Sequence, residues 1–290
     1  MAPSGVFTAL VTPFKNDELD IVSFEKLVRT QVDGGVTGVV VCGTTGEVPV
    51  LSTDEFKELV SVTVESAQGL KVFVGVGSCD TKQAVEKVQI ANSFKVDGML
   101  AVTPYYNKPT QSGLMDYYGA LASETDKEIM LYSIPSRTGI EIAIPTIEAL
   151  KNKYDNINSL KEATTNCGRV DEMVRMFGQE FSVFSGDDSM TLPFMALGAV
   201  GVVSVMSNIA PRDMSNMVNL AYTGDFHTAL TVYHTMSPIM RKLFIECNPL
   251  PAKFLLHKMG IIASAECRSP LGRLSQQSID ELTEAMRAYK

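Results

Sequence analysis

The sequence has little that would suit a membrane or a nucleic-acid partner. None of its apolar runs approaches the ~18 residues that a bilayer-spanning helix needs. No stretch gathers Lys and Arg, and 25 basic against 33 acidic residues give a formal net charge of −8. Phosphate backbones bind clustered positive charge. We therefore expect neither a membrane span nor nucleic-acid binding.

Cysteine and histidine are also sparse. The five cysteines are odd in number and widely spaced, with no CxxC pair, which does not fit a disulfide framework. All three histidines come late in the chain on helical patterns, which disfavours a Cys–His dyad and a zinc site. The opening residues lack the basic-then-apolar pattern of a signal peptide. These features predict free thiols and a cytoplasmic location.

Short apolar runs alternate with amphipathic stretches along most of the chain. Runs rich in Val, Ile and Phe are typical of strands buried on both faces. They are 5–11, 36–41, 72–76, 98–102, 129–132, 157–160, 181–184 and 200–205. Between them apolar residues recur at helical spacing, as in Phe24, Leu27 and Val28, and again in Phe56, Leu59, Val60 and Thr63.

This alternation predicts an α/β fold, a (β/α)8 TIM barrel with a C-terminal three-helix extension. We expect the catalytic barrel at 1–224 and the helical extension at 225–290. An open doubly wound sheet would carry a glycine-rich phosphate loop after its first strand, but the sequence there is Thr12-Pro13-Phe14-Lys15. Capping boxes at Ser52/Glu55 and Ser278/Glu281 predict two helix starts. Pro145 and Pro211 suit first helical turns.

The active site of such a barrel lies at the carboxyl ends of its strands. The predicted sixth strand ends in Lys161. Burial lowers the pKa of an amine and produces a free base that can attack a ketone. The alternative for Lys161 is a buried ion pair with a carboxylate such as Glu162.

Other strand ends supply polar groups. The segment 43–47, Gly-Thr-Thr-Gly-Glu, offers Thr44, Thr45 and backbone N–H groups to a carboxylate or phosphate. We expect Glu47 to accept hydrogen bonds within its turn rather than to act as a base. The Pro-bounded loop 103–109 holds Tyr105 and Tyr106, which suit either an active site or a subunit interface.

The fifth and seventh strand ends add charge. Tyr132 is followed by a Pro/Gly loop that carries Arg137, which suits a carboxylate clamp or a surface salt bridge. Asp187 and Asp188 follow the seventh strand, where helix capping is favoured over metal binding.

Taken in order, these segments resemble the dihydrodipicolinate synthase/N-acetylneuraminate lyase family over essentially the whole chain. The matching segments are Thr8–Phe14, Gly43–Glu47, Tyr105–Asn107, Tyr132 with Pro135–Gly139, Lys161–Ala163 and Ser185–Asp188. Within the family Arg137 favours the synthase branch, whose arginine holds the carboxylate of aspartate semialdehyde. Sialic acid lyases usually carry smaller or apolar residues there.

The resemblance implies a Schiff-base condensation of pyruvate with aspartate semialdehyde, giving 4-hydroxy-tetrahydrodipicolinate in lysine and diaminopimelate biosynthesis. Lys161 forms the imine, and Tyr132, Thr44 and Tyr106 form a proton relay. By the same resemblance, the residues that bind the substrates are Thr45, Arg137, Gly186 and Val203. The resemblance implies no metal or organic cofactor.

The resemblance also bears on assembly and regulation. In relatives the residue matching Tyr106 enters a neighbouring subunit's site, which implies a homo-oligomer, commonly a tetramer made of two tight dimers. Relatives that bind lysine as an inhibitor have polar groups at matching positions of that interface. This chain has different residues there, so we expect weak or no inhibition by lysine. They are Val48, Pro49, Thr53, Cys79 and Gln83.

One departure from the family pattern and two rival functions stay open. Thr165 stands where relatives often have glycine, which predicts a tighter turn after Lys161. Rival functions are another pyruvate-dependent aldolase, acting on sialic or sugar acids, and an inactive relative with a binding role. Arg137 disfavours the first, and the joint presence of Lys161, Tyr132, Thr44 and Tyr106 disfavours the second.

Overall fold

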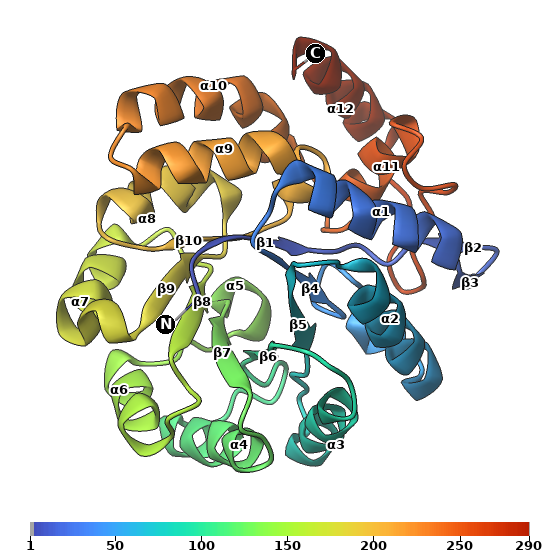
Figure 1. Cartoon of the computed structure of the whole chain (residues 1–290). Coiled ribbons are helices and arrows are strands. Elements are labelled where there is room, and N and C mark those ends of the chain that lie inside the picture. The colour runs from blue at the N-terminus through green and yellow to red at the C-terminus, as the bar shows by residue number, and fades with distance from the viewer. Residues whose placement is uncertain (1–2, 290) are drawn as a thin grey trace. The chain divides into compact units, whose positions relative to one another are not determined.

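The computed structural model describes residues 3–289. Eight strands form a closed barrel in the order β1-β10-β9-β8-β7-β6-β5-β4, as predicted (Figure 1). The barrel strands are β1 (Gly5–Ala9), β4 (Gly38–Val41), β5 (Lys71–Gly75), β6 (Gly98–Val102), β7 (Glu128–Ser133), β8 (Ser159–Glu162), β9 (Ser182–Ser185) and β10 (Gly201–Ser204). A short antiparallel pair, β2 (Phe14–Lys15) with β3 (Glu18–Leu19), follows β1.

The helices of the described residues alternate with these strands. They are α1 (Ile21–Gly34), α2 (Thr53–Ser66), α3 (Thr81–Asn92), α4 (Gln111–Ser123), α5 (Pro135–Thr138), α6 (Ile144–Lys153), α7 (Cys167–Phe177), α8 (Thr191–Ala196) and α9 (Pro211–Tyr222). The predicted three-helix extension consists of α10 (Phe226–Lys242), α11 (Leu250–Lys258) and α12 (Gln276–Tyr289). The chain divides into two compact units, Phe73–Val203 and Gly5–Val72 with the segment from Ser204 onward. The boundary at 224 remains a prediction.

The first unit, residues 73–203, carries β5 to β10 with α3 to α8. Its strands pair in parallel, and the register places Tyr132 of β7 opposite Lys161 of β8. The next pairing sets Lys161 opposite Phe184 of β9. These strands are apolar because helices cover them, and Tyr117 and Tyr118 of α4 are fully buried beneath that layer.

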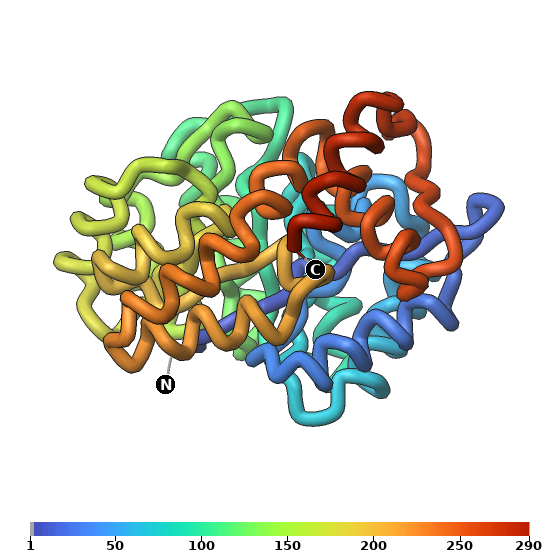
Figure 2. The backbone as a smooth tube through the Cα atoms, turned by 90° about the horizontal axis from the view of Figure 1, so that it is seen from above, coloured from blue at the N-terminus to red at the C-terminus, as the bar shows by residue number. Residues whose placement is uncertain are grey.

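The second unit holds residues 5–72 and the chain from 204 onward. Its strands β1 and β4 are parallel neighbours, with Phe7 opposite Gly38. Helix α9 lies along α10, and α10 packs against α12 (Figure 2). Helices α1 and α2 bury the apolar faces that their spacing predicts, including Phe24, Leu27, Phe56 and Leu59.

Helix starts were predicted well with one exception. Ser52 and Glu55 form the expected capping box of α2. Pro145 and Pro211 occupy first-turn positions of α6 and α9. The box at Ser278/Glu281 is wrong, because α12 already begins at Gln276. Ser275 Oγ accepts from the Ser278 N–H at 3.2 Å, so the capping serine lies three residues before the one that was predicted.

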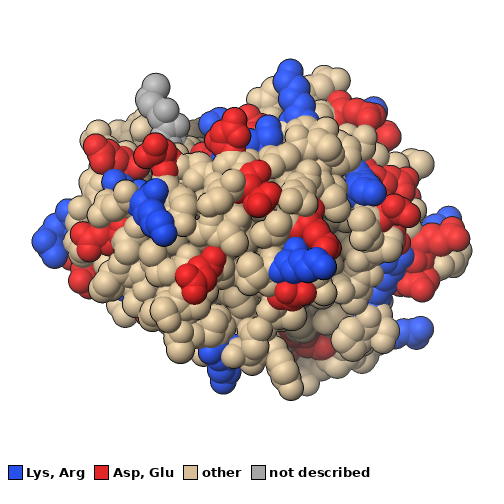
Figure 3. All heavy atoms as spheres, turned by 90° about the horizontal axis from the view of Figure 1, so that it is seen from below, with Lys and Arg blue, Asp and Glu red and all other residues tan. Residues whose placement is uncertain are grey.

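Surface charge is mixed. On the face drawn in Figure 3, Lys and Arg side chains are interspersed with Asp and Glu. Within residues 3–289 no helix is both long and apolar enough to cross a bilayer. All five cysteines are free thiols, as predicted.

Candidate active site

Lys161 is the third residue of β8 and is only 4% exposed. The parallel register brings it beside Tyr132, and Lys161 Nζ lies 4.4 Å from the centre of that ring. Burial lowers the pKa of Lys161 to about 8, the Asp188 carboxylate opposes this shift, and the Arg137 guanidinium adds to it. At neutral pH a fraction of the amine is therefore unprotonated, as a nucleophile requires.

Glu162 does not pair with Lys161. Successive strand residues point to opposite sides, and Glu162 Oε2 accepts from Arg169 Nε at 3.0 Å. Both side chains are buried, and Arg169 also donates to the Ile142 carbonyl at 2.6 Å and lies 3.3 Å from Glu141. The ion-pair alternative for Lys161 with Glu162 is thus wrong. Arg169 was missed, although a buried Glu162 demands a nearby cation.

Arg137 lies exposed on α5, directly after β7. Pro135 starts this single helical turn, and Gly139 ends it with a left-handed φ of 70°. The Thr138 hydroxyl fixes the turn, since it accepts from the Thr103 hydroxyl at 3.1 Å and donates to the Ile140 carbonyl at 2.9 Å. The segment is therefore a defined turn whose guanidinium is close enough to influence the pKa of Lys161.

Tyr106 projects from the loop after β6 and is 94% exposed. Its φ of 73° is left-handed, a strained conformation for a bulky residue. The next residue fixes the loop, because Asn107 Nδ2 donates to the Cys79 carbonyl at 2.7 Å. A large aromatic side chain is thus held out into solvent by an ordered loop.

The ends of β9 and β10 carry further predicted residues. Gly186 donates its N–H to the Glu162 carbonyl at 2.7 Å, and a Cβ there would stand 2.7 Å from Ala163 Cβ, so only glycine fits. Asp187 accepts from the Ser189 N–H at 2.8 Å and caps the following turn, as predicted. Val203 is buried in β10.

The segment 43–47 after β4, called here the β4 loop, belongs to the second unit. Thr44 is half-buried, and Thr45 is buried and accepts from Asn248 Nδ2 at 2.9 Å. Glu47 is a structural acceptor, as expected, but its partners are remote rather than local. Its Oε1 accepts from Lys253 Nζ at 2.6 Å and its Oε2 from the Arg268 N–H at 2.9 Å. No sequence pattern indicated that Asn248, Lys253 and Arg268 would contact this loop.

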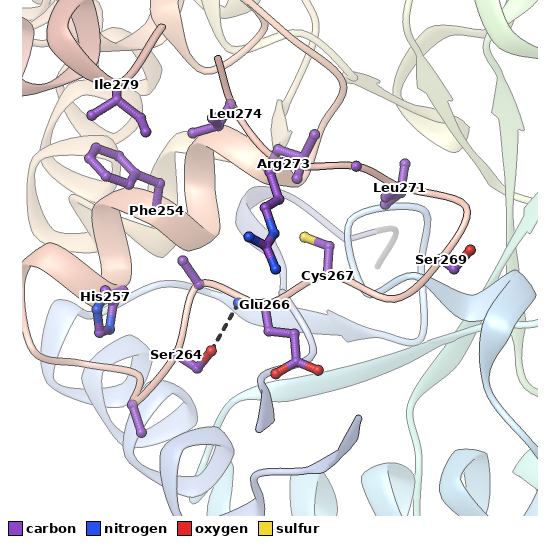
Figure 4. A pocket seen from close by; sticks show the side chains of 14 residues that line it. Phe254, His257, Ser264, Glu266, Cys267, Ser269, Leu271, Arg273, Leu274 and Ile279 are labelled. Carbon is purple, nitrogen blue, oxygen red and sulfur yellow. Dashed lines mark hydrogen bonds between the residues drawn. The ribbon is translucent and has the colours of Figure 1, made fainter. Parts of the chain in front are cut away.

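A separate cavity of about 810 Å³ lies between α11, α12 and the segment 263–274 (Figure 4). Its lining includes Phe254, Cys267 and Ile279, and none of the predicted site residues belongs to it. The predicted reacting groups lie instead in or after the barrel strands.

Sequence and structure comparisons find similar proteins over nearly the whole chain. The family model described as the Dihydrodipicolinate synthetase family matches residues 2–289. A 4-hydroxy-tetrahydrodipicolinate synthase of Hydrogenobaculum sp. is 42% identical over 287 residues, covering 99% of this chain and 98% of that protein. The dihydrodipicolinate synthase of Aquifex aeolicus superposes with a TM-score of 0.96 at 41% identity, covering 99% and 98% of the two chains. The 4-hydroxy-tetrahydrodipicolinate synthase of Methylacidiphilum fumariolicum SolV gives 0.97 at 41% identity, covering 99% and 96%.

Proposed function

Since the chain belongs to the Dihydrodipicolinate synthetase family, we infer that it is a lyase that condenses pyruvate with aspartate semialdehyde. The product is 4-hydroxy-tetrahydrodipicolinate, on the route to diaminopimelate and lysine. The observation that supports a Schiff-base mechanism best is Lys161, a buried amine with a lowered pKa at the end of a barrel strand.

In the proposed reaction Lys161 Nζ attacks the keto carbon of pyruvate, and loss of water gives an imine. The imine withdraws electrons, so the methyl carbon loses a proton and becomes an enamine. This carbon attacks the aldehyde carbon of the semialdehyde, whose oxygen takes up a proton. The substrate's own amine then adds to the imine carbon and displaces Lys161, which closes the ring and frees the enzyme.

The roles of the other residues follow from the family resemblance. Tyr132 lies against Lys161 and moves protons together with Thr44 and Tyr106. Thr45 and backbone N–H groups of the β4 loop bind the pyruvate carboxylate. Arg137 binds the carboxylate of the semialdehyde as a bidentate partner. The carbonyls of Gly186 and Val203 line the pyruvate site.

The decisive experiment measures pyruvate consumption with aspartate semialdehyde and, in parallel, with N-acetylmannosamine. We expect consumption with the semialdehyde alone, and a covalent pyruvate adduct on Lys161 after borohydride reduction. Lys161→Ala should lose both, whereas Lys95→Ala, which removes an exposed lysine, should keep both. Consumption with the sugar alone would assign the chain to the sialic acid lyases instead.

We also propose a homo-oligomer with a tight dimer as its minimum and a tetramer of two dimers as its common form. The supporting observation is Tyr106, whose exposed aromatic side chain stands on an ordered loop and would be covered by a second subunit. The cytoplasmic location stays a prediction from the free thiols.

Weak inhibition by lysine is the regulatory part of the proposal. Val48 is half-buried, and Pro49, Thr53, Cys79 and Gln83 are exposed. None of the five side chains carries a formal charge, so none pairs electrostatically with the ammonium and carboxylate groups of lysine. We expect activity to persist at millimolar lysine. Half-inhibition well below a millimolar in a lysine titration would contradict this expectation.

A further inference from the structure

The β4 loop is held by the C-terminal extension as well as by its own turn, in which the Gly46 and Glu47 N–H groups donate to the Gly43 and Thr44 carbonyls at 3.1 Å each. Glu47 ends the loop with a left-handed φ of 56°, and its side chain is 1% exposed. A non-glycine residue keeps such a conformation only where its surroundings fix it. Both of its carboxylate oxygens are bonded to residues more than 200 positions later, Lys253 and Arg268.

Asn248 fixes the direction of the Thr45 hydroxyl. The Asn248 side-chain amide donates to Thr45 Oγ1 at 2.9 Å in a buried contact. A hydroxyl has a single proton and two acceptor lone pairs. Because the Asn248 amide occupies one lone pair, the Thr45 proton points away from Asn248 and can be donated to another acceptor, such as a substrate carboxylate.

Lys253 is a fully buried cation that contacts one carboxylate and one aromatic ring. Its Nζ bonds to Glu47 and stands 4.3 Å from the centre of the Phe14 ring. The Arg268 guanidinium also lies 4.2 Å from this ring and bonds to Glu55 of α2 at 2.5 Å. The β4 loop, the start of α2 and the extension are thereby joined by charge-assisted bonds.

Cys267, which lines the cavity of Figure 4, lies close enough to Glu47 and Lys253 for their charges to act on its thiol. Burial raises the pKa of the Cys267 thiol to about 12, the charge of Lys253 opposes the rise and that of Glu47 adds to it. The thiol therefore stays neutral beside the ion pair and adds no third charge.

We propose that Asn248 and Lys253 are positioning residues of the pyruvate-carboxylate site, acting through Thr45 and Glu47 of the β4 loop. This inference rests on the proposed function, in which Thr45 binds pyruvate. Neither residue touches the reacting carbon, so their loss weakens pyruvate binding and leaves the chemistry at Lys161 unchanged.

The test is Asn248→Ala, which removes the bond to Thr45 without removing a charge. The pyruvate concentration that half-saturates borohydride trapping at Lys161 should rise about fivefold, the size of one lost hydrogen bond. Trapping at saturating pyruvate and the KM for the semialdehyde should match the wild-type enzyme. A purely structural role would lower the melting temperature and leave the half-saturating pyruvate concentration unchanged, which would overturn the proposal.

Lys253 is tested in the double variant Glu47→Gln/Lys253→Met, which leaves no buried charge unpaired. This variant should also need more pyruvate for half-saturation, whereas Lys258→Met, an exposed lysine on the same helix, should not. A folded double variant with wild-type saturation would overturn the role of Lys253. If the double variant does not fold, Asn248→Ala decides alone.

Trapping separates this inference from the proposed function. A wild-type enzyme that traps pyruvate but does not consume aspartate semialdehyde refutes the proposed second substrate, and the trapping midpoint of Asn248→Ala still decides the inference. A wild-type enzyme that traps no pyruvate at Lys161 overturns both.

Discussion

At the scale of single residues, the protonation of Lys161 governs the first chemical step. An amine with a pKa of about 8 is roughly one-tenth unprotonated at pH 7, whereas an unshifted lysine is roughly 0.03% unprotonated. Burial therefore raises the nucleophilic fraction by roughly 300-fold. Burial of the amine is the largest cause of the shift, and the Arg137 guanidinium adds to it.

This protonation predicts a pH dependence with a definite sign. The lowered pKa means that the amine loses its proton as the pH rises through about 8, so imine formation should rise about tenfold per pH unit below 8 and level off above it. The rate of borohydride-trapped adduct formation between pH 6 and 9.5 measures this. Asp188→Asn should move the midpoint to lower pH, because the Asp188 carboxylate raises the pKa. A flat profile would contradict the assignment.

The buried ion pair of Arg169 with Glu162 predicts an effect on stability, and a double variant serves as the control. Arg169→Met leaves the Glu162 carboxylate buried without its cation and should lower the free energy of unfolding by about 3–5 kcal/mol. Adding Glu162→Gln removes the uncompensated charge and should restore most of the loss. Urea unfolding at fixed protein concentration measures both variants. Equal stabilities of the single variant and the wild type would show that the pair is not needed.

Residue types at strand ends could be predicted from the sequence, but their partners could not. Lys161 was singled out because a lysine ends an apolar run, and its catalytic role was predicted from the family resemblance. Glu47 was expected to bond locally, but Lys253 stands 206 residues later. Periodicity and capping patterns extend over a few residues, so a contact made only by tertiary packing leaves no trace in them.

At the scale of elements, prediction succeeded where one local signal dominated. All eight barrel strands overlap the predicted apolar runs, because buried parallel strands cannot carry many polar side chains. The start of α12 was misplaced because the Ser278/Glu281 spacing fits a capping box, although the cap in the structure is Ser275. The choice was made by tertiary contacts, in which Glu246 accepts from the Ser275 hydroxyl at 2.8 Å.

The caps give a prediction that compares three serines. Ser52→Ala and Ser275→Ala should each lower the free energy of unfolding by about 1 kcal/mol, because each removes a bond to a helical N–H group. Ser278→Ala should cost less than half as much, since Ser278 caps no N–H group. Chemical unfolding of the three variants gives the comparison. An equal cost at 278 and 275 would place the cap where the sequence suggested.

At the scale of the whole molecule, the position of Tyr106 predicts a complementation between inactive subunits. If Tyr106 serves the neighbouring subunit, then Tyr106→Phe and Lys161→Ala chains refolded together form mixed dimers with one complete site. Activity should recover to about a quarter of the wild-type level on random pairing of subunits in closed dimers. Each variant refolded alone is the control. No recovery, with dimers present by ultracentrifugation, would mean that Tyr106 serves its own chain.

The ion pair between Glu47 and Lys253 can form only late in the synthesis of the chain. A ribosome adds 206 residues between the two, which takes roughly 10–40 s at about 5–20 residues per second. Until Lys253 has been added, the Glu47 carboxylate lacks the cation that pairs with it in the folded chain. The β4 loop therefore reaches its final form only when the last helices leave the ribosome. A truncated chain that ends between Lys161 and Lys253 contains the lysine that is proposed to form the imine but cannot form this ion pair.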